Sequence, residues 1–252
     1  MDLFFKCGDP DHGGKVFDKM RVRNVVSGFW TTMISGLVAC GELDAANLVF
    51  EQMPGRNVVS WTAIINGYSR NQWPNEAFIL FRRILQVDNV KPNEYTLVSL
   101  LIACTELRSL NLGRRIHDFA FKNGFDLGVF LGTALIDMYS KCGSLEDAKR
   151  VFDSMDVKGT ATWNSIITNL RVHGRGEEAL NLFEQMEAAN VEPDAVTFVG
   201  VLCACVRTNN VTGACRYFKR MTERYGICPN ADPIVAWLNS AAMPTFQMKL
   251  SL

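Results

Sequence analysis

A short apolar pattern that returns at nearly constant intervals constrains the fold of this 252-residue chain more than any other feature. In its clearest copies an apolar pair is followed three residues later by methionine, as in Val49-Phe50 with Met53. The anchor residues lie 31 to 36 positions apart, at Phe17, Phe50, Phe81, Ile116, Phe152, Phe183 and Phe218. A period in this range is typical of repeat proteins, in which each repeat is one supersecondary unit.

Each repeat contains two apolar stretches with helical spacing. The first stretch begins with tryptophan in three repeats, at Trp30, Trp61 and Trp163. Apolar residues then follow at i, i+3, i+4 and i+7, which places them on one face of an α-helix. One repeat shows this spacing twice, in Trp61, Ile64, Ile65 and Tyr68 and again in Ala77, Leu80, Phe81 and Ile84. We therefore expect two amphipathic helices of about a dozen residues in each repeat.

Glycine and proline mark the ends of these helices. Glycine follows the first stretch at Gly8, Gly41, Gly143 and Gly174, where a left-handed residue can end a helix. Pro92 and Pro193 follow the second stretch and discourage helical continuation. Because one helical hairpin cannot cover its own apolar face, neighbouring hairpins must stack. The sequence thus predicts an all-α fold, an α-solenoid superhelix of stacked helix-turn-helix repeats.

The composition supports a packed core but gives no global signal for a ligand. Hydrophobic residues make up 48% of the chain, and 26 basic side chains balance 26 acidic ones. A net charge of +0 favours neither nucleic acid nor an anionic membrane, so any such partner must be argued from local residues. Eight cysteines without a secretory signal favour a reducing compartment, and we find neither a transit segment nor a membrane span.

Two segments carry a resemblance to a known family. Asn57-Val58-Val59-Ser60-Trp61-Thr62 and the run from Ala134 to Ala148 resemble pentatricopeptide repeats of land plants. The similarity covers most of the chain and favours this family over tetratricopeptide repeats, which have a similar period. The alternating repeat lengths resemble the subclass that mixes standard, long and short repeats. We assign the repeats to residues 1–24 (partial), 25–57, 58–93, 94–128, 129–159, 160–194 and 195–230.

The sequence also departs from the family pattern. Gly28 and Phe29 interrupt the segment before Thr31, Met1 matches the middle of a first helix, and residues 231–252 form a divergent C-terminal tail. On this basis we expect a chain truncated at both ends.

The resemblance implies that single-stranded RNA is the partner. In the family, the fifth and last residues of a repeat together select one base, while the second residue packs against that base. These rules give the base-selecting pairs Thr31 with Asn57, Thr62 with Asn93, Thr133 with Gly159, and Asn164 with Asp194. Val98 and Val199 hold the fifth position of the long repeats and should not read bases by hydrogen bonding. The expected preference is A-A-N-R-U-N, written 5′ to 3′.

Structural roles compete with this interpretation. Thr31 and Thr62 could be first-turn residues, and Asn93 and Asp194 could be helix caps. Taken singly each position favours capping, and only recurrence in the repeat favours base selection. Four cations late in the first helices are either phosphate contacts or partners of the helix dipole: Lys6, Arg70, Lys141 and Arg207.

We expect neither catalysis nor a cofactor. The zinc site of the family's deaminase-like domain needs His-x-Glu and Cys-x-x-Cys, and His12, His117 and His173 lack the glutamate. A metal cluster of Cys203, Cys205 and Cys215 is less favoured than burial in the core. Core packing is likewise favoured over base stacking for Trp30, Trp61 and Trp163, and surface positions for His117 and His173.

Three functions follow as alternatives. The first is sequence-selective binding of single-stranded RNA by an adaptor for a separate RNA editing or processing factor. The resemblance alone places that adaptor in a mitochondrion or chloroplast. The second is a protein-binding helical scaffold, and the third is a nonfunctional truncated product.

Overall fold

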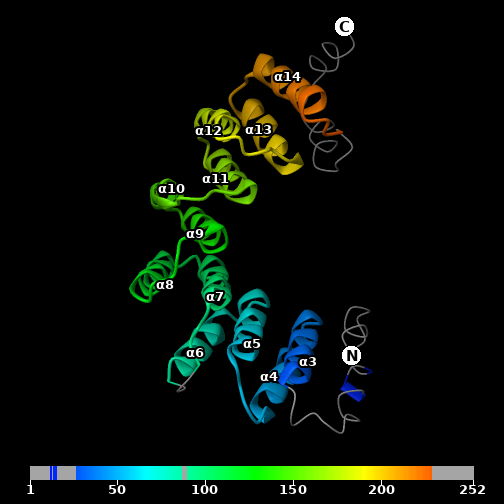
Figure 1. Ribbon diagram of the computed structural model, residues 1–252, viewed down its shortest axis with the longest axis vertical. Helices are drawn as coiled ribbons and strands as arrows, with labels where there is room; N and C mark the ends of the chain where they lie inside the picture. The colour runs from blue at the N-terminus through cyan, green and yellow to red at the C-terminus, as the bar shows by residue number, and fades with distance from the viewer. Residues whose placement is uncertain (1–11, 13, 16–26, 87–89, 229–252) are drawn as a thin grey trace. The chain divides into compact units, whose positions relative to one another are not determined.

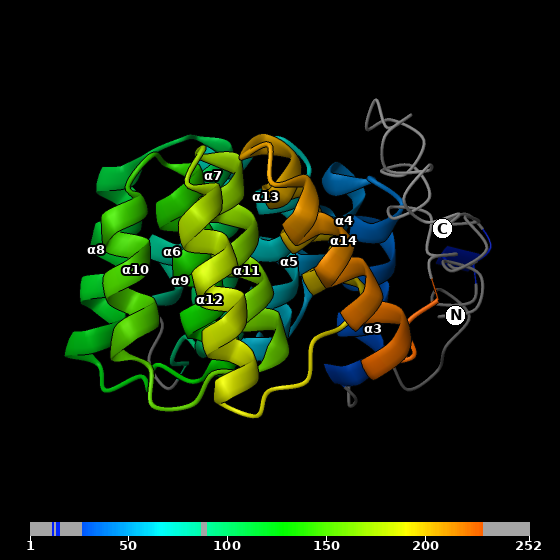
Figure 2. The same cartoon turned by 90° about the horizontal axis from the view of Figure 1, so that it is seen from above.

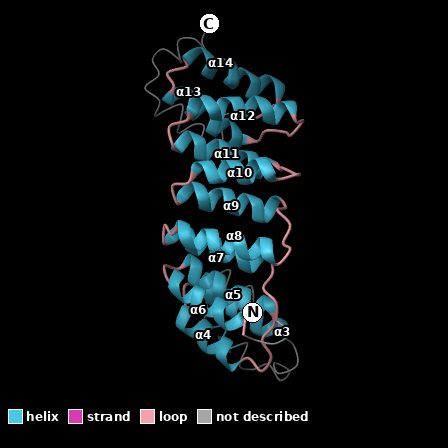
Figure 3. Cartoon of the chain, turned by 90° about the vertical axis from the view of Figure 1, so that its left-hand side faces the viewer, coloured by secondary structure: helices cyan, strands magenta, loops and turns pink. Residues whose placement is uncertain are grey.

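The computed structural model describes residues 12, 14–15, 27–86 and 90–228, and every regular element among them is a helix (Figure 3). Lys6, most of the expected repeat 1–24 and the expected tail 231–252 lie outside these residues. The chain forms two compact bodies, an N-terminal body of residues 1–126 and a C-terminal body of residues 127–252.

The N-terminal body consists of antiparallel helix pairs (Figure 1). The first helix of each pair packs against its own second helix and against the first helix of the next pair. First helices are α3 (Ser27–Ala39), α5 (Val58–Arg70) and α7 (Glu94–Glu106), and second helices are α4 (Leu43–Gln52), α6 (Pro74–Ile84) and α8 (Leu110–Lys122).

The C-terminal body repeats this arrangement (Figure 2). Its first helices are α9 (Val129–Lys141), α11 (Thr160–Val172) and α13 (Ala195–Arg207). Its second helices are α10 (Leu145–Ser154), α12 (Gly176–Ala188) and α14 (Val211–Lys219), the last continuing as a π-helical segment, η1 (Arg220–Arg224). The stacking of these helix pairs confirms the predicted all-α fold of helix-turn-helix repeats.

The turn inside each hairpin contains a residue in the left-handed region. Gly41, Gly143 and Gly174 have φ values of 80°, 85° and 78°, as the sequence predicted. Three other turns place Gln72, Arg108 and Asn209 in this region, at φ values of 67°, 47° and 52°. These side chains tolerate a conformation that favours glycine, so the turn geometry comes from the hairpin and not from glycine alone.

The tryptophans pack in the core. Trp30, Trp61 and Trp163 are at most 6% exposed, which confirms the core interpretation. The Trp61 ring meets Phe50 of the preceding second helix edge to face, with ring centroids 4.8 Å apart, and Trp163 meets Phe152 at the same distance. The same contact thus recurs in the two bodies, joining each second helix to the next first helix.

Cysteine also contributes to the core. Cys205 is buried in α13, whereas Cys203 and Cys215 are half-buried. Within residues 27–86 and 90–228, no group of three or more histidine, cysteine or carboxylate side chains could hold a metal ion.

Ion pairs link successive second helices. Glu51 of α4 pairs with Arg83 of α6 over 2.7 Å, Lys149 of α10 with Glu178 of α12 over 2.9 Å, and Glu184 of α12 with Arg220 of η1 over 3.1 Å. Opposite charges therefore face each other between most neighbouring second helices. In the described part of the chain, none of the helices has the length and apolar character needed to cross a membrane.

Candidate nucleic-acid interface

The first helices of three repeats start with the same polar cap. The side chains of Asn57, Asn93 and Asp194 each accept a hydrogen bond over 2.9 Å from the backbone N–H three residues later. The third residue of each helix returns the bond, because its hydroxyl accepts from the backbone N–H of the cap. This reciprocal capping box satisfies two backbone donors at the helix start. Asn93 and Asp194 are therefore helix caps, as the capping interpretation predicted.

In α5 and α11, the fifth residue lies beside the cap of the next first helix of the same body. Asn164 Nδ2 donates to Asp194 Oδ1 over 2.9 Å, and Thr62 Oγ1 donates to Asn93 Oδ1 over 3.4 Å. As fifth residues of their helices, Thr31 and Thr62 lie beyond the first helical turn, so the first-turn interpretation does not hold. The structure thus brings together two of the four pairs that the sequence predicted to select bases, across the boundary between repeats.

A third side chain completes each of these pairs, and it was missed by the sequence analysis. Thr197 Oγ1 donates to Asn164 Oδ1 over 2.5 Å, and Thr96 and Thr62 share a hydrogen bond of 2.7 Å between their hydroxyls. Both third-position threonines are buried. The only available signal was a hydroxyl residue three positions after Asn or Asp, which is the spacing of a capping box.

The capping bond decides which atom of each cap remains available. Oδ1 of Asn57 and of Asn93 accepts the helix N–H, and among the described residues nothing bonds their Nδ2 groups. Asp194 likewise uses Oδ1, which leaves Oδ2 as an acceptor. An asparagine cap therefore offers a donor, and the aspartate cap offers an acceptor.

Asp194 is held in its charged form. Partial burial by itself raises its pKa, but the hydrogen bonds from the Thr197 backbone and from Asn164 outweigh burial and lower the pKa below its ordinary value. At neutral pH Oδ2 of Asp194 is thus a carboxylate acceptor.

The other two predicted pairs differ. Thr133 bonds the hydroxyl of Thr162 over 2.9 Å, as Thr62 bonds Thr96, but the cap Gly159 has no side chain that could join this pair. Thr31 is the half-buried fifth residue of α3, and Asn57 caps the next first helix, α5. Val98 and Val199 are the half-buried fifth residues of α7 and α13.

The second residue of most first helices is an exposed apolar side chain. Val59 and Tyr95 are 55% and 61% exposed, and Phe130 and Val196 are exposed in the same way. Each lies three residues before a fifth position, on the same helical face. This repetition becomes visible only after the helix starts are aligned.

The four candidate cations have different surroundings. Arg207 donates to the carbonyl oxygens of Arg171 and Val172, over 3.1 Å and 3.3 Å, and so stabilises the C-terminal end of α11. Arg70 and Lys141 lie exposed in the last turns of α5 and α9, and neither has a carboxylate partner within the described residues. Arg70 Nε donates only to Asn66 Oδ1, over 3.0 Å.

Of the histidines, His12 and His173 are exposed and His117 is half-buried.

Models of the PPR repeat family match residues 56–106 and 158–207, and models of the PPR repeat match residues 1–25, 29–58, 133–160 and 196–225. A chloroplastic pentatricopeptide repeat-containing protein of Arabidopsis thaliana is 65% identical over 91% of this chain and 50% of its own length. A mitochondrial one from the same plant is 38% identical over 92% of this chain and 36% of its own. The chain thus spans about half or less of the curated relatives it matches.

Solved structures show the same fold. The pentatricopeptide repeat protein PPR10 from maize superposes with a TM-score of 0.72 at 20% identity, over 99% of this chain and 37% of its own. PPR10 in complex with an 18-nt psaJ RNA element superposes with a TM-score of 0.68 at 17% identity, over 88% of this chain and 33% of its own. From the repeat models, which cover most of the sequence, we conclude that the chain belongs to the pentatricopeptide repeat family.

Proposed function

We propose that this chain binds single-stranded RNA sequence-selectively, one base per repeat, through the fifth and last residues of its repeats. The observation that carries the proposal is the contact between Asn164 and Asp194, together with its counterpart between Thr62 and Asn93. In both pairs, the side chain of a fifth residue is hydrogen-bonded to the cap of the next first helix, so the two side chains lie together at one site. Binding of RNA by PPR10, a protein of the same fold, supports the proposal.

The free cap atoms suit different bases. The Watson–Crick edge of adenine presents an acceptor at N1, and that of uracil presents an N–H donor at N3. The donor Nδ2 groups of Asn57 and Asn93 therefore fit adenine, and Oδ2 of Asp194 fits uracil. We accordingly propose the preference A-A-N-R-U-N, with the repeats in the register set by the helix starts.

Exposed apolar residues would support the bases from one side. Val59, Tyr95, Phe130 and Val196 stand near the starts of their helices and offer surfaces against which a base face can pack. Base stacking on the aromatic members, Tyr95 and Phe130, contributes about 1 to 3 kcal/mol per base, independently of sequence. Arg70 and Lys141 are free to meet phosphates, whereas Arg207 is engaged at the end of α11.

Beyond RNA binding itself, we propose a biological role for the chain and a cellular location. The repeat lengths fit the subclass with standard, long and short repeats, and we propose an adaptor, itself without catalysis, for a separate RNA editing or processing factor. The relatives named chloroplastic and mitochondrial support an organellar location.

A binding measurement tests the proposal. The chain is titrated at low salt with A-A-N-R-U-N RNA and with a scrambled RNA, and then the Asn164→Thr variant is titrated with RNAs that differ at the fifth nucleotide. We expect the matched RNA to bind more tightly, and the variant to move its preference from uracil toward guanine. Guanine N1–H still meets the Asp194 carboxylate, and the shorter threonine leaves room for a purine. Asn181→Thr, the same exchange at an exposed site on α12, is the control and should leave the preference unchanged.

Two outcomes contradict the proposal. One is the absence of binding to either RNA. The other is an Asn164→Thr variant that folds normally but retains the base preference of the unmodified chain.

A further inference from the structure

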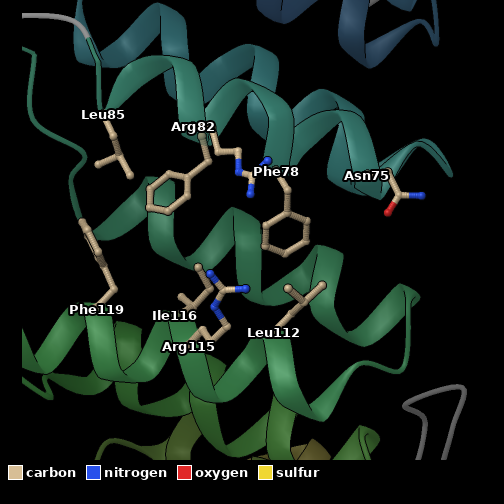
Figure 4. A pocket seen from close by; sticks show the side chains of 9 residues that line it. Asn75, Phe78, Arg82, Leu85, Leu112, Arg115, Ile116 and Phe119 are labelled. Carbon is tan, nitrogen blue, oxygen red and sulfur yellow. The ribbon is translucent and has the colours of Figure 1, made fainter.

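A cavity of about 480 Å³ lies between the second helices α6 and α8, within the N-terminal body (Figure 4). Both helices line it with the same spacing of i, i+3, i+4 and i+7. These residues are Phe78, Phe81 and Arg82 on α6 with Leu85 at its C-terminal cap, and Leu112, Arg115, Ile116 and Phe119 on α8. At a rise of about 1.5 Å per residue, the lined groove is about two helical turns long.

The floor of the groove is apolar and closed. Phe81 and Ile116 are buried, and the Phe81 ring meets Phe119 edge to face with centroids 5.3 Å apart. Higher on the walls, Phe78 and Leu112 are half-buried, and Leu85 is 49% exposed. Apolar surface thus continues from the core to the rim, where it meets water.

The charges at this groove differ from those between other second helices. Glu51 with Arg83 and Lys149 with Glu178 join opposite charges across their helix pairs. Here, in contrast, Arg82 comes from α6 and Arg115 from α8, and both are exposed. Neither has a carboxylate within ion-pair distance among the described residues. Two positive charges without a counterion therefore flank an apolar groove.

We propose that this groove binds an acidic, amphipathic segment of another protein. An apolar helix face with anchors at i, i+3 or i+4 and i+7 matches the length and lining of the groove. Carboxylates beside those anchors would supply the partner that Arg82 and Arg115 lack, with bidentate geometry available to each guanidinium.

Other occupants fit less well. RNA binding depends on rows of cations that follow the phosphates, and this groove has two cations over an apolar floor. A second copy of the same groove would bring the two arginines against two more, which is repulsive. The groove uses no residue of the base-selecting pairs, so this proposal does not depend on the proposed RNA binding.

A peptide titration of the full chain tests the proposal. The probe is a short labelled peptide with leucine and phenylalanine on one helical face and glutamate beside them, and its matched form has glutamine in place of each glutamate. We expect the glutamate peptide to bind about tenfold or more tightly than the glutamine peptide at low salt, with the difference shrinking as salt rises.

Substitutions then locate the site. The double variant Arg82→Gln with Arg115→Gln should lose the difference between the two peptides. Lys122→Gln, an exposed site on α8 outside the groove, should keep it. Leu85→Ala should weaken both peptides. All variants should retain the helical circular dichroism of the unmodified chain, because the substituted side chains are exposed.

The test also separates this proposal from RNA binding. Affinity for A-A-N-R-U-N RNA should be the same for the double variant and the unmodified chain. Equal binding of the two peptides to the unmodified chain would overturn the proposal. So would a double variant that loses RNA affinity but still discriminates between the peptides.

Discussion

The side-chain amide of Asn164 bridges two repeats, because its Nδ2 donates to Asp194 Oδ1 over 2.9 Å. Its Oδ1 in turn accepts from the Thr197 hydroxyl over 2.5 Å. Both ends of the amide are therefore fixed by residues of the following helix. A residue that caps one helix and a residue that follows it by three positions together orient the fifth side chain of the preceding repeat.

Thr197 is accordingly predicted to act as a positioning residue. Thr197→Val keeps the shape of the side chain but removes the bond to Asn164 and half of the capping box. We expect a loss of about 1 to 2 kcal/mol in the free energy of unfolding, measured by urea denaturation. We also expect a weaker uracil preference at the fifth nucleotide, measured by RNA titration.

Thr197→Ser is the rescue variant, because it restores the hydroxyl and with it both hydrogen bonds. It should recover the uracil preference. If Thr197→Val lowers stability yet leaves the base preference intact, Thr197 is only a structural cap.

Two glycines, Gly143 and Gly55, allow the effect of backbone conformation on stability to be measured without a steric contribution. At Gly143 (φ 85°) and at Gly55, an added Cβ would meet no atom within 4 Å, but only Gly143 has a positive φ. Gly143→Ala should therefore lower the free energy of unfolding by about 1 kcal/mol through conformation alone. Gly55→Ala, the matched control, should leave it unchanged or raise it slightly. Equal effects in urea denaturation would contradict this account of the turn.

Stability should depend on pH through Asp194. Its pKa in the folded chain is lowered, so its contribution is complete above the unfolded pKa and is lost as the pH falls through the folded pKa. Below about pH 4 the urea midpoint of the unmodified chain should therefore fall relative to that of Asp194→Asn. The substituted cap cannot titrate, which makes it the reference. Parallel pH profiles of the two midpoints would show that Asp194 contributes no such dependence.

Cys205 is predicted to be inert in the folded chain. Burial raises the pKa of its thiol to about 12, with a further contribution from the charge of Glu177. Little reactive thiolate forms at pH 8. Exposed Cys228 should be alkylated by iodoacetamide at least about 100-fold faster, measured by mass spectrometry of peptides. In concentrated urea the two rates should converge, and a folded-state rate for Cys205 similar to that of Cys228 would contradict its burial.

Periodic features of the fold were predictable from the sequence. The apolar spacing from Trp61 to Ile65 and from Ala77 to Ile84 identified both helices of a repeat, and these side chains are buried as expected. Glycine identified the turn at Gly143. Both signals work because burial and left-handed conformation each restrict which residues a position accepts.

Less periodic features were not predictable. Nothing in the sequence distinguishes Arg108 as a left-handed turn residue, because the neighbouring helices impose that conformation. The role of Thr96 depends on its approach to Thr62, 34 residues away. The charge pattern of the groove likewise depends on which arginines α6 and α8 turn toward each other. Such features are set by packing between repeats, whereas local sequence sets the repeats themselves.

The cap side chains provide the most direct test of base selection. Asp194→Asn keeps the size of the cap but replaces its free acceptor with a donor, and Asn93→Asp makes the opposite change. With fluorescence anisotropy, the affinity of each variant is measured for RNAs carrying each of the four bases at the second and fifth nucleotides. Asp194→Asn should change the preference at the fifth nucleotide from uracil to cytosine, because N3 of cytosine is an acceptor. Asn93→Asp should change the preference at the second nucleotide from adenine to guanine, because N1 of guanine carries a proton. If both folded variants keep the base preferences of the unmodified chain, the caps do not select bases and the central claim is wrong.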